Sequence, residues 1–124
     1  MACAEVMSEH YDVTGYDIYP KTSDKIKISD NLRGAVTGQD IVFIAVQTPH
    51  DPAYGGQAPI THLKNVDFDY TIVEEVLKQV NAWASPEQLV VLISTVLPGT
   101  TRERLRPLIT NARFVYNPYL IAMG

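Results

Sequence analysis

An acidic side chain stands at the end of the first apolar run of this sequence. The run covers 11–17, "YDVTGYD", and its last residue is Asp17. A carboxylate at the end of the second strand of a dinucleotide-binding unit accepts a hydrogen bond from a ribose 2′-hydroxyl and repels a 2′-phosphate. Asp17 therefore favours NAD over NADP as a ligand. The alternative interpretation is that Asp17 only caps a turn ahead of Pro20.

Hydroxyl side chains follow the two most apolar runs. Thr48 and Pro49 come after "IVFIAV" at 41–46, and Thr95 comes after "QLVVLI" at 88–93. Ligands of open α/β sheets bind outside the carboxyl ends of the strands. A hydroxyl and backbone N–H groups at strand ends suit a pyrophosphate or a carboxamide, so these residues are candidate cofactor contacts. The alternative for Thr95 is a strand-end hydroxyl that is satisfied within the protein.

Four short strands would position these side chains, at 11–17, 41–46, 88–93 and 113–117. Each run is bounded by Gly, Pro, Asp or Asn. The two middle runs are apolar throughout, which is typical of strands buried on both faces of a parallel sheet. We therefore expect helices on both sides of the sheet.

Amphipathic patterns predict the helices between these strands. A crossover helix is expected over 67–83, with an apolar stripe at Ile72, Val73, Val76, Leu77 and Val80. A weaker helix is expected over 29–36, capped by Ser29 or Asp30. A short helical end at the N-terminus would turn Ala2, Val6 and Met7 toward a core.

A further helix is expected behind the Pro98-Gly99 turn. Thr100 and Glu103 have the spacing of a capping box, and Pro107 should bend or end the helix. The alternation of strands and helices predicts a Rossmann-like, doubly wound α/β fold with a mostly parallel sheet. At 124 residues the chain is predicted to form one domain, 1–124.

Composition limits the partners. The net charge is −4 and ten Lys and Arg residues are spread along the chain, so no basic face for nucleic acid or an anionic membrane is expected. Cys3 is the single cysteine, which excludes an internal disulfide and suits a reducing cytoplasm. The long irregular stretch at 47–65 is of a length that is usually functional or mobile.

The glycine-rich fingerprint of a dinucleotide-binding unit is not in this sequence. Its third glycine would fall at or just before Met1, counting back from Asp17. The sheet is thus expected to lack its first strand, which is central in the Rossmann order. Two unpaired edges predict self-association, or direct pairing of 11–17 with 41–46, and a weak affinity for NAD.

Four stretches together resemble a known family. "YDVTGYDIYP", "DIVFIAVQTP", "QLVVLISTVLPGTTRERLRPL" and "FVYNP" are similar to the N-terminal NAD-binding domain of the UDP-glucose/GDP-mannose 6-dehydrogenases. The resemblance implies that Asp17 binds the ribose and that Thr48, Pro49 and Thr95 line the phosphate and nicotinamide side. It also implies a full-length parent that oxidises the primary alcohol of a nucleotide sugar to a carboxylate with NAD. The nucleophile of that reaction would lie outside this chain, so no catalytic residue is assigned.

The chain departs from the family pattern after Asn117-Pro118. Tyr119 and Met123 stand where the family has carboxylates. This difference motivates an alternative, a non-catalytic nucleotide-binding or assembly module derived from the same fold. A methyltransferase-like domain that binds S-adenosylmethionine through Asp17 is a third possibility, against which "STVLPGTT" argues.

Overall fold

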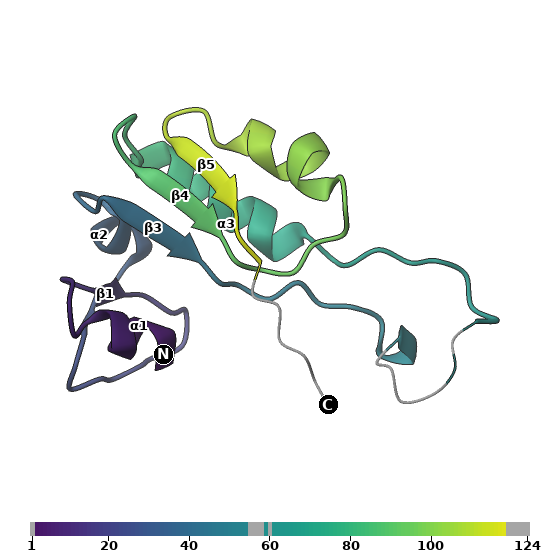
Figure 1. Cartoon of the computed structure of the whole chain (residues 1–124), viewed down its shortest axis with the longest axis horizontal. Helices are drawn as coiled ribbons and strands as arrows, with labels where there is room; N and C mark the ends of the chain where they lie inside the picture. Colours follow the sequence, from purple (N-terminus) through teal and green to yellow (C-terminus); the bar gives the residue numbers. More distant parts are fainter. Residues whose placement is uncertain (1, 55–58, 60, 119–124) are drawn as a thin grey trace. The chain divides into compact units, whose positions relative to one another are not determined.

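A computed structural model describes residues 2–54, 59 and 61–118 of the chain (Figure 1). The chain forms two compact units, Met1–Gln39 and Asp40–Gly124, and each unit has its own parallel sheet. Tyr119 and Met123, on which the sequence departs from the family pattern, lie outside the described residues. None of the described helices combines the length and apolar character that crossing a membrane requires.

The first unit contains a two-stranded parallel sheet. Its elements are α1 (Ala2–Met7), β1 (Thr14–Gly15), β2 (Lys27–Ile28) and α2 (Leu32–Val36). Thr14 pairs with Lys27 and Gly15 with Ile28. The strand predicted over 11–17 is therefore real but only two residues long, and the sequence analysis missed β2. Among the described residues the ladder partner of β1 is β2.

Two local predictions for the first unit were wrong. Val6 of α1 is 64% exposed, so it does not face a core. Helix α2 is capped by Asn31, whose side chain accepts a hydrogen bond from the Gly34 N–H at 2.8 Å, rather than by Ser29 or Asp30. An Asn side chain satisfies the first backbone donors of a helix as well as Ser or Asp does, which explains the shift.

The second unit is built on a three-stranded parallel sheet. Its strands are β3 (Ile41–Ile44), β4 (Leu89–Leu92) and β5 (Arg113–Tyr116), in that order. Between them lie the 3-10 turn η1 (Pro52–Tyr54), helix α3 (Thr71–Trp83), the π-helical segment η2 (Thr101–Leu105) and the 3-10 turn η3 (Arg106–Leu108). Figure 1 shows the three strands side by side, with α3 behind them. The strands lie close to the predicted ranges.

The two faces of this sheet differ in burial. Val42 and Val90 are in register, and so are Ile44 and Leu92; all four side chains are buried, as are Val73, Leu77 and Val80 of α3. On the other face Ile41 and Phe43 are 48% and 43% exposed. The prediction of burial on both faces is thus confirmed for β4 and wrong for β3. The physical reason is position, since β4 is central and β3 has a ladder on one side only among the described strands.

Candidate functional site

Asp17 lies in an exposed turn after β1. Its Oδ1 accepts a hydrogen bond from the Tyr19 N–H at 2.9 Å, and its Oδ2 lies 3.9 Å from the Lys21 ammonium nitrogen. The Asp17 side chain is 41% exposed. The capping interpretation of Asp17 is therefore seen directly. The same carboxylate still presents acceptor capacity to solvent, since an ionised carboxylate offers about four lone-pair sites.

Thr48 and Thr95 are joined at the carboxyl ends of neighbouring strands. The Thr48 hydroxyl donates to the backbone carbonyl of Thr95 at 2.7 Å. One position earlier, the Ser94 hydroxyl donates to the Val46 carbonyl at 2.6 Å. Two hydrogen bonds therefore join the segments that follow β3 and β4. Their hydroxyl groups lie at the edge where parallel sheets bind ligands.

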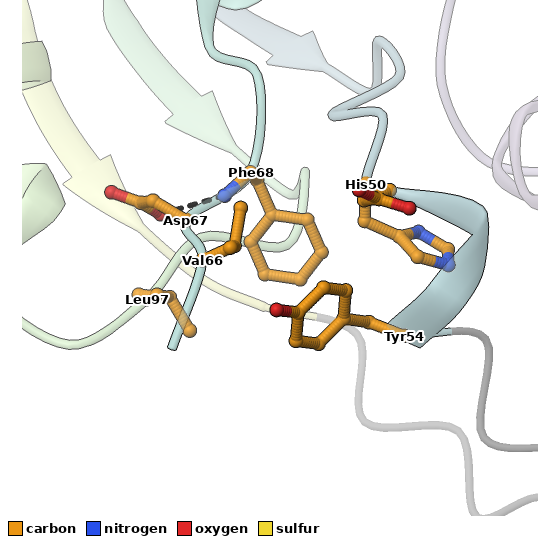
Figure 2. Close-up of a pocket in the computed structure, with 7 residues that line it drawn as sticks. His50, Tyr54, Val66, Asp67, Phe68 and Leu97 are labelled. Carbon is orange, nitrogen blue, oxygen red and sulfur yellow. Dashed lines mark hydrogen bonds between the residues drawn. The ribbon is translucent and has the colours of Figure 1, made fainter. Parts of the chain in front are cut away.

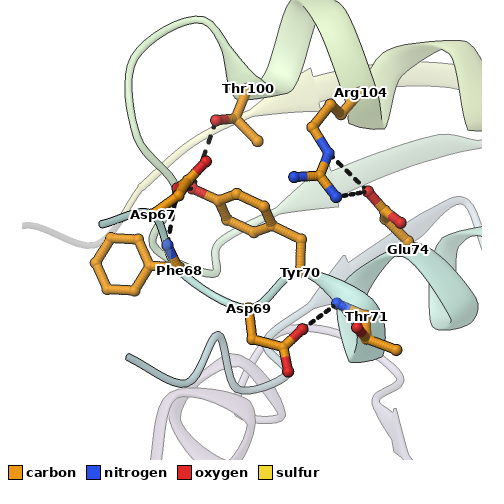
Figure 3. Close-up of polar contacts among 8 residues, drawn as sticks. All are labelled: Asp67, Phe68, Asp69, Tyr70, Thr71, Glu74, Thr100 and Arg104. Atoms are coloured by element: carbon orange, nitrogen blue, oxygen red, sulfur yellow. Dashed lines mark hydrogen bonds and ion pairs between the residues drawn. The ribbon is translucent and has the colours of Figure 1, made fainter. Parts of the chain in front are cut away.

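Pro49 is fixed from the start of helix α3. Its carbonyl accepts a hydrogen bond from the Asp69 N–H at 2.8 Å. The Asp69 carboxylate in turn accepts from the Thr71 N–H at 2.9 Å, in the first turn of α3 (Figure 3). Hydrogen bonds from the Thr71 side chain and backbone lower the pKa of Asp69 below its ordinary value. The second unit thus brings Thr48, Pro49 and Thr95 together, while Asp17 lies in the first unit.

A buried tyrosine connects α3 with the segment that follows Thr95. Tyr70 is 1% exposed, and its hydroxyl donates to Asp67 Oδ1 at 2.5 Å. The Tyr70 hydroxyl oxygen also accepts hydrogen bonds from the Leu97 N–H at 3.1 Å and from the Thr100 hydroxyl at 3.4 Å. One donor and two acceptor positions are all that a phenolic hydroxyl offers, and each is used. Figure 3 shows Tyr70 between Asp67, Thr100 and Arg104.

This network contradicts the predicted capping box. Thr100 has helical backbone angles, φ −53° and ψ −43°, and makes no side-chain cap hydrogen bond. The backbone N–H groups of Arg102 and Glu103 instead bond to the Gly99 carbonyl, each at 3.0 Å. The Thr100 hydroxyl donates to Tyr70, and the Glu103 N–H, which a capping box would direct to Thr100, is paired with Gly99.

Burial and an arginine further define the environment of Tyr70. Burial is the main cause that raises the pKa of the Tyr70 hydroxyl above its ordinary value, and the hydrogen bond to Asp67 adds to it. The Arg104 guanidinium carbon lies 4.9 Å from the centre of the Tyr70 ring. Arg104 also pairs with Glu74 of α3 at 2.6 Å, which fixes the guanidinium over the ring.

Sequence reasoning missed two residues that anchor the site, Tyr70 and Tyr116. The Tyr116 hydroxyl accepts from the Val96 N–H at 3.4 Å. One signal was present in "DFDYT", where two carboxylates precede a tyrosine directly before a helix. A polar cluster of this kind at a helix start is a candidate anchor, but its partner 27 positions away is set only by the fold.

A pocket of about 340 Å³ lies beside this network (Figure 2). It is lined by His50, Asp51, Tyr54, Val66, Asp67, Phe68 and Leu97. The rings of His50 and Phe68 meet edge to face, with centroids 6.1 Å apart. The pocket shares Asp67 and Leu97 with the hydrogen bonds of Tyr70. The loops after β3 and β4 therefore form both structures.

Parallel ladders, intervening helices and polar groups at the strand ends define a Rossmann-like dinucleotide-binding fold. Residues 7–122 match the UDP-glucose/GDP-mannose dehydrogenase family, NAD binding domain. The chain belongs to this family, and membership supports a nicotinamide dinucleotide as its cofactor. It does not favour the alternative of a non-catalytic assembly module. No match was found among curated protein sequences.

Solved structures with the same fold come from dehydrogenases of nucleotide sugars. GDP-mannose dehydrogenase from Pseudomonas aeruginosa has a TM-score of 0.72 and 22% identity, over 97% of this chain and 34% of that one. A UDP-glucose dehydrogenase from Pyrobaculum islandicum has a TM-score of 0.71 and 22% identity, over 98% of this chain and 34% of that one. The UDP-D-ManNAc dehydrogenase from Pyrococcus horikoshii has a TM-score of 0.69 and 21% identity, over 98% of this chain and 34% of that one. The present chain thus spans about a third of these proteins.

Proposed function

We propose that this chain is the NAD-binding part of a nucleotide-sugar 6-dehydrogenase, which oxidises the primary alcohol of its sugar to a carboxylate in two successive hydride transfers. The observation that carries the proposal is the pair Thr48 and Thr95, hydrogen-bonded at the carboxyl ends of β3 and β4 in a chain of this family. NAD, when bound, supplies the hydride acceptor.

Each site residue has a distinct task in this proposal. Asp17 accepts a hydrogen bond from the ribose 2′-hydroxyl through the carboxylate lone pairs that its hydrogen bond to the Tyr19 N–H does not use. Its negative charge disfavours the 2′-phosphate of NADP. Thr48, Pro49 and Thr95 line the phosphate and nicotinamide side. Their backbone is held by other parts of the second unit, which lets their polar groups meet a ligand without rearrangement.

The remaining chemistry belongs to other parts of the parent protein. A thiol nucleophile and a pocket for the sugar nucleotide are needed besides the cofactor site, and the family resemblance assigns neither to this chain. We therefore expect no turnover from the chain alone. The single cysteine, Cys3, suits a reducing compartment, and we expect the protein in the cytoplasm.

We also propose that the chain self-associates. Among the described strands, β3 has a ladder to β4 only, and its side chains Ile41 and Phe43 are exposed. An unpaired strand edge with apolar side chains is a template for pairing with another chain. Sedimentation equilibrium should detect a dimer or a larger assembly, and a monomer at all concentrations would contradict this proposal.

Calorimetric titration with NAD and NADP tests the proposed cofactor. The chain should bind NAD more tightly than NADP, and Asp17→Asn should remove most of this preference, because it removes the charge that repels the 2′-phosphate. Asp24→Asn is a matched control, since Asp24 is an exposed carboxylate of the same unit. Equal loss of preference in both variants, or tighter binding of NADP by the wild type, would contradict the assignment.

A further inference from the structure

We propose that Tyr70 is a positioning residue for the dinucleotide: its hydroxyl holds the backbone of 94–97 in the conformation in which Thr95 meets the cofactor. This inference rests on the proposed function and adds a residue to it. Tyr70 is buried and its hydroxyl bonds to the backbone of Leu97, so it acts through the segment that it binds.

Four consecutive residues after β4 are each anchored by a hydroxyl group. Ser94 donates its own hydroxyl to the β3 end, and the Thr95 carbonyl accepts from Thr48. The Val96 N–H donates to the Tyr116 hydroxyl, and the Leu97 N–H donates to the Tyr70 hydroxyl. The backbone on both sides of the Thr95 side chain is therefore fixed. Side chains of this segment alternate in burial, with Ser94 and Val96 buried and Thr95 exposed.

Tyr70 differs from the other three anchors in that its hydroxyl makes three hydrogen bonds, to Asp67, Leu97 and Thr100. Its hydroxyl contacts Leu97 at 3.1 Å, against 3.4 Å between Tyr116 and Val96. Asp67 accepts the hydrogen bond of the Tyr70 hydroxyl at 2.5 Å, which directs the oxygen lone pairs toward Leu97 and Thr100. The ring is held between the start of α3 and the Arg104 guanidinium. A hydroxyl fixed on all sides transmits the position of α3 to the segment that carries Thr95.

The effect of Tyr70 on the segment is separable from its effect on folding. Tyr70→Phe keeps the buried ring and removes one oxygen. The N–H of Leu97 then lacks its tyrosine acceptor, while the packing of the Tyr70 ring is unchanged. The second unit should therefore stay folded, while residues 95–97 gain freedom and the cofactor must order them again on binding.

The test uses the whole 124-residue chain with 15N labelling, which reports single amides in one experiment. Two readouts are compared between wild type, Tyr70→Phe and Tyr54→Phe: the exchange rate of the Leu97 amide, and the dissociation constant for NAD, titrated into the millimolar range. Tyr54→Phe is the matched control, because it also deletes one phenolic hydroxyl, which bonds to the Lys64 carbonyl.

We expect Tyr70→Phe to speed Leu97 exchange by about tenfold or more and to weaken NAD binding by about tenfold, the equivalent of one lost hydrogen bond. Tyr54→Phe should change neither quantity. Unchanged NAD affinity in a folded Tyr70→Phe variant would overturn the proposal, even if Leu97 exchange were faster. Equal weakening in both variants would overturn it as well.

A milder variant covers the case in which Tyr70→Phe does not fold. Asp67→Asn keeps the shape of the side chain and weakens the hydrogen bond that orients Tyr70. It should shift both readouts in the same direction by less, and a wild-type exchange rate at Leu97 would contradict the proposal. If neither the wild type nor a chain extended upstream by a glycine-rich strand and turn binds NAD, the proposed function fails. The exchange rate of Leu97 then still decides whether Tyr70 holds the segment.

Discussion

The Asp17 turn and the segment 94–97 both follow strands, yet they are held in different ways. The contacts of Asp17 reach residues two and four positions along the chain. The hydrogen bonds of 94–97 that involve hydroxyl groups reach residues 20 to 48 positions away, in β3, α3 and β5 or just beside them. The Asp17 ion pair is exposed and long at 3.9 Å, whereas the partner of Leu97 is a buried hydroxyl.

The difference predicts how strongly each region is preorganised for the cofactor. A loop held only by local contacts opens at a low cost in free energy. A loop anchored to several distant elements is preorganised, because ordering its backbone was part of folding. We therefore expect cofactor binding to change the mobility of the Asp17 turn more than that of 94–97. The predictions below break or sharpen this comparison.

The largest effect on stability should follow from truncating a core side chain next to the segment 94–97. Leu92 is fully buried at the end of β4, and Leu92→Ala should lower the free energy of unfolding by about 2–5 kcal/mol through lost burial and a cavity. Ile18, beside Asp17, is 76% exposed, and Ile18→Ala should stay within about 0.5 kcal/mol. Urea unfolding followed by circular dichroism measures both. Similar losses in the two variants would remove the distinction between the regions.

A smaller effect is expected at the link between the strand ends. Thr48→Val keeps the side-chain shape and removes the hydroxyl that donates to the Thr95 carbonyl, at a cost of about 1 kcal/mol in urea unfolding. Thr22→Val, at an exposed position of the first unit, is the control and should be near neutral. A neutral Thr48→Val would mean that water replaces this hydrogen bond without loss.

The pH dependence of stability should carry the signature of Tyr70. Its pKa is raised above the ordinary value of 10.0, so the unfolded chain loses this proton first as the pH rises. The corresponding stability is fully present below pH 10 and is lost as the pH climbs through the folded-state pKa. The stability difference between wild type and Tyr70→Phe should therefore shrink above pH 10, as measured by urea unfolding at a series of pH values. A constant difference would argue against a buried, protonated hydroxyl.

The smallest effect is expected at the surface pair above the ring of Tyr70. Arg104 is 49% exposed and Glu74 is 25% exposed, so solvent screens the attraction. Arg104→Gln should cost about 0.5 kcal/mol, with the ring contact included. Arg102→Gln on the same segment is the control. A loss of several kcal/mol at Arg104 would show that the pair behaves as if it were buried.

The strands of the second unit could be predicted from the sequence because their apolar runs are continuous. The runs at 41–46 and 88–93 lie within two residues of β3 and β4. Burial of β3 on one face only could not be predicted, since it depends on which strand is central. In the first unit β2 is only two residues long, so it offers no continuous apolar run; the Lys–Ile alternation at 25–28 was the available strand signal.

The site residues could be placed at strand ends, but their anchors could not. The pattern of Thr100 and Glu103 predicts a capping box from neighbours three positions apart. In the folded chain the Glu103 N–H bonds to the Gly99 carbonyl instead. The Thr100 hydroxyl donates to Tyr70, 30 positions away. Asp17 could be interpreted either as a turn cap or as a ribose ligand. The structure displays the cap, and the ribose contact stays a prediction.

Calorimetry with NAD tests the central claim most directly, run in parallel on this chain and on a version extended upstream by a glycine-rich strand and turn. The account predicts that the extended form binds NAD more tightly and that Asp17→Ala in that form abolishes binding, because the glycine-rich turn and helix start receive the pyrophosphate and Asp17 receives the ribose. Absence of binding in both forms would contradict it. Asp17 would then be a turn residue, and the family likeness would extend to the fold without the cofactor.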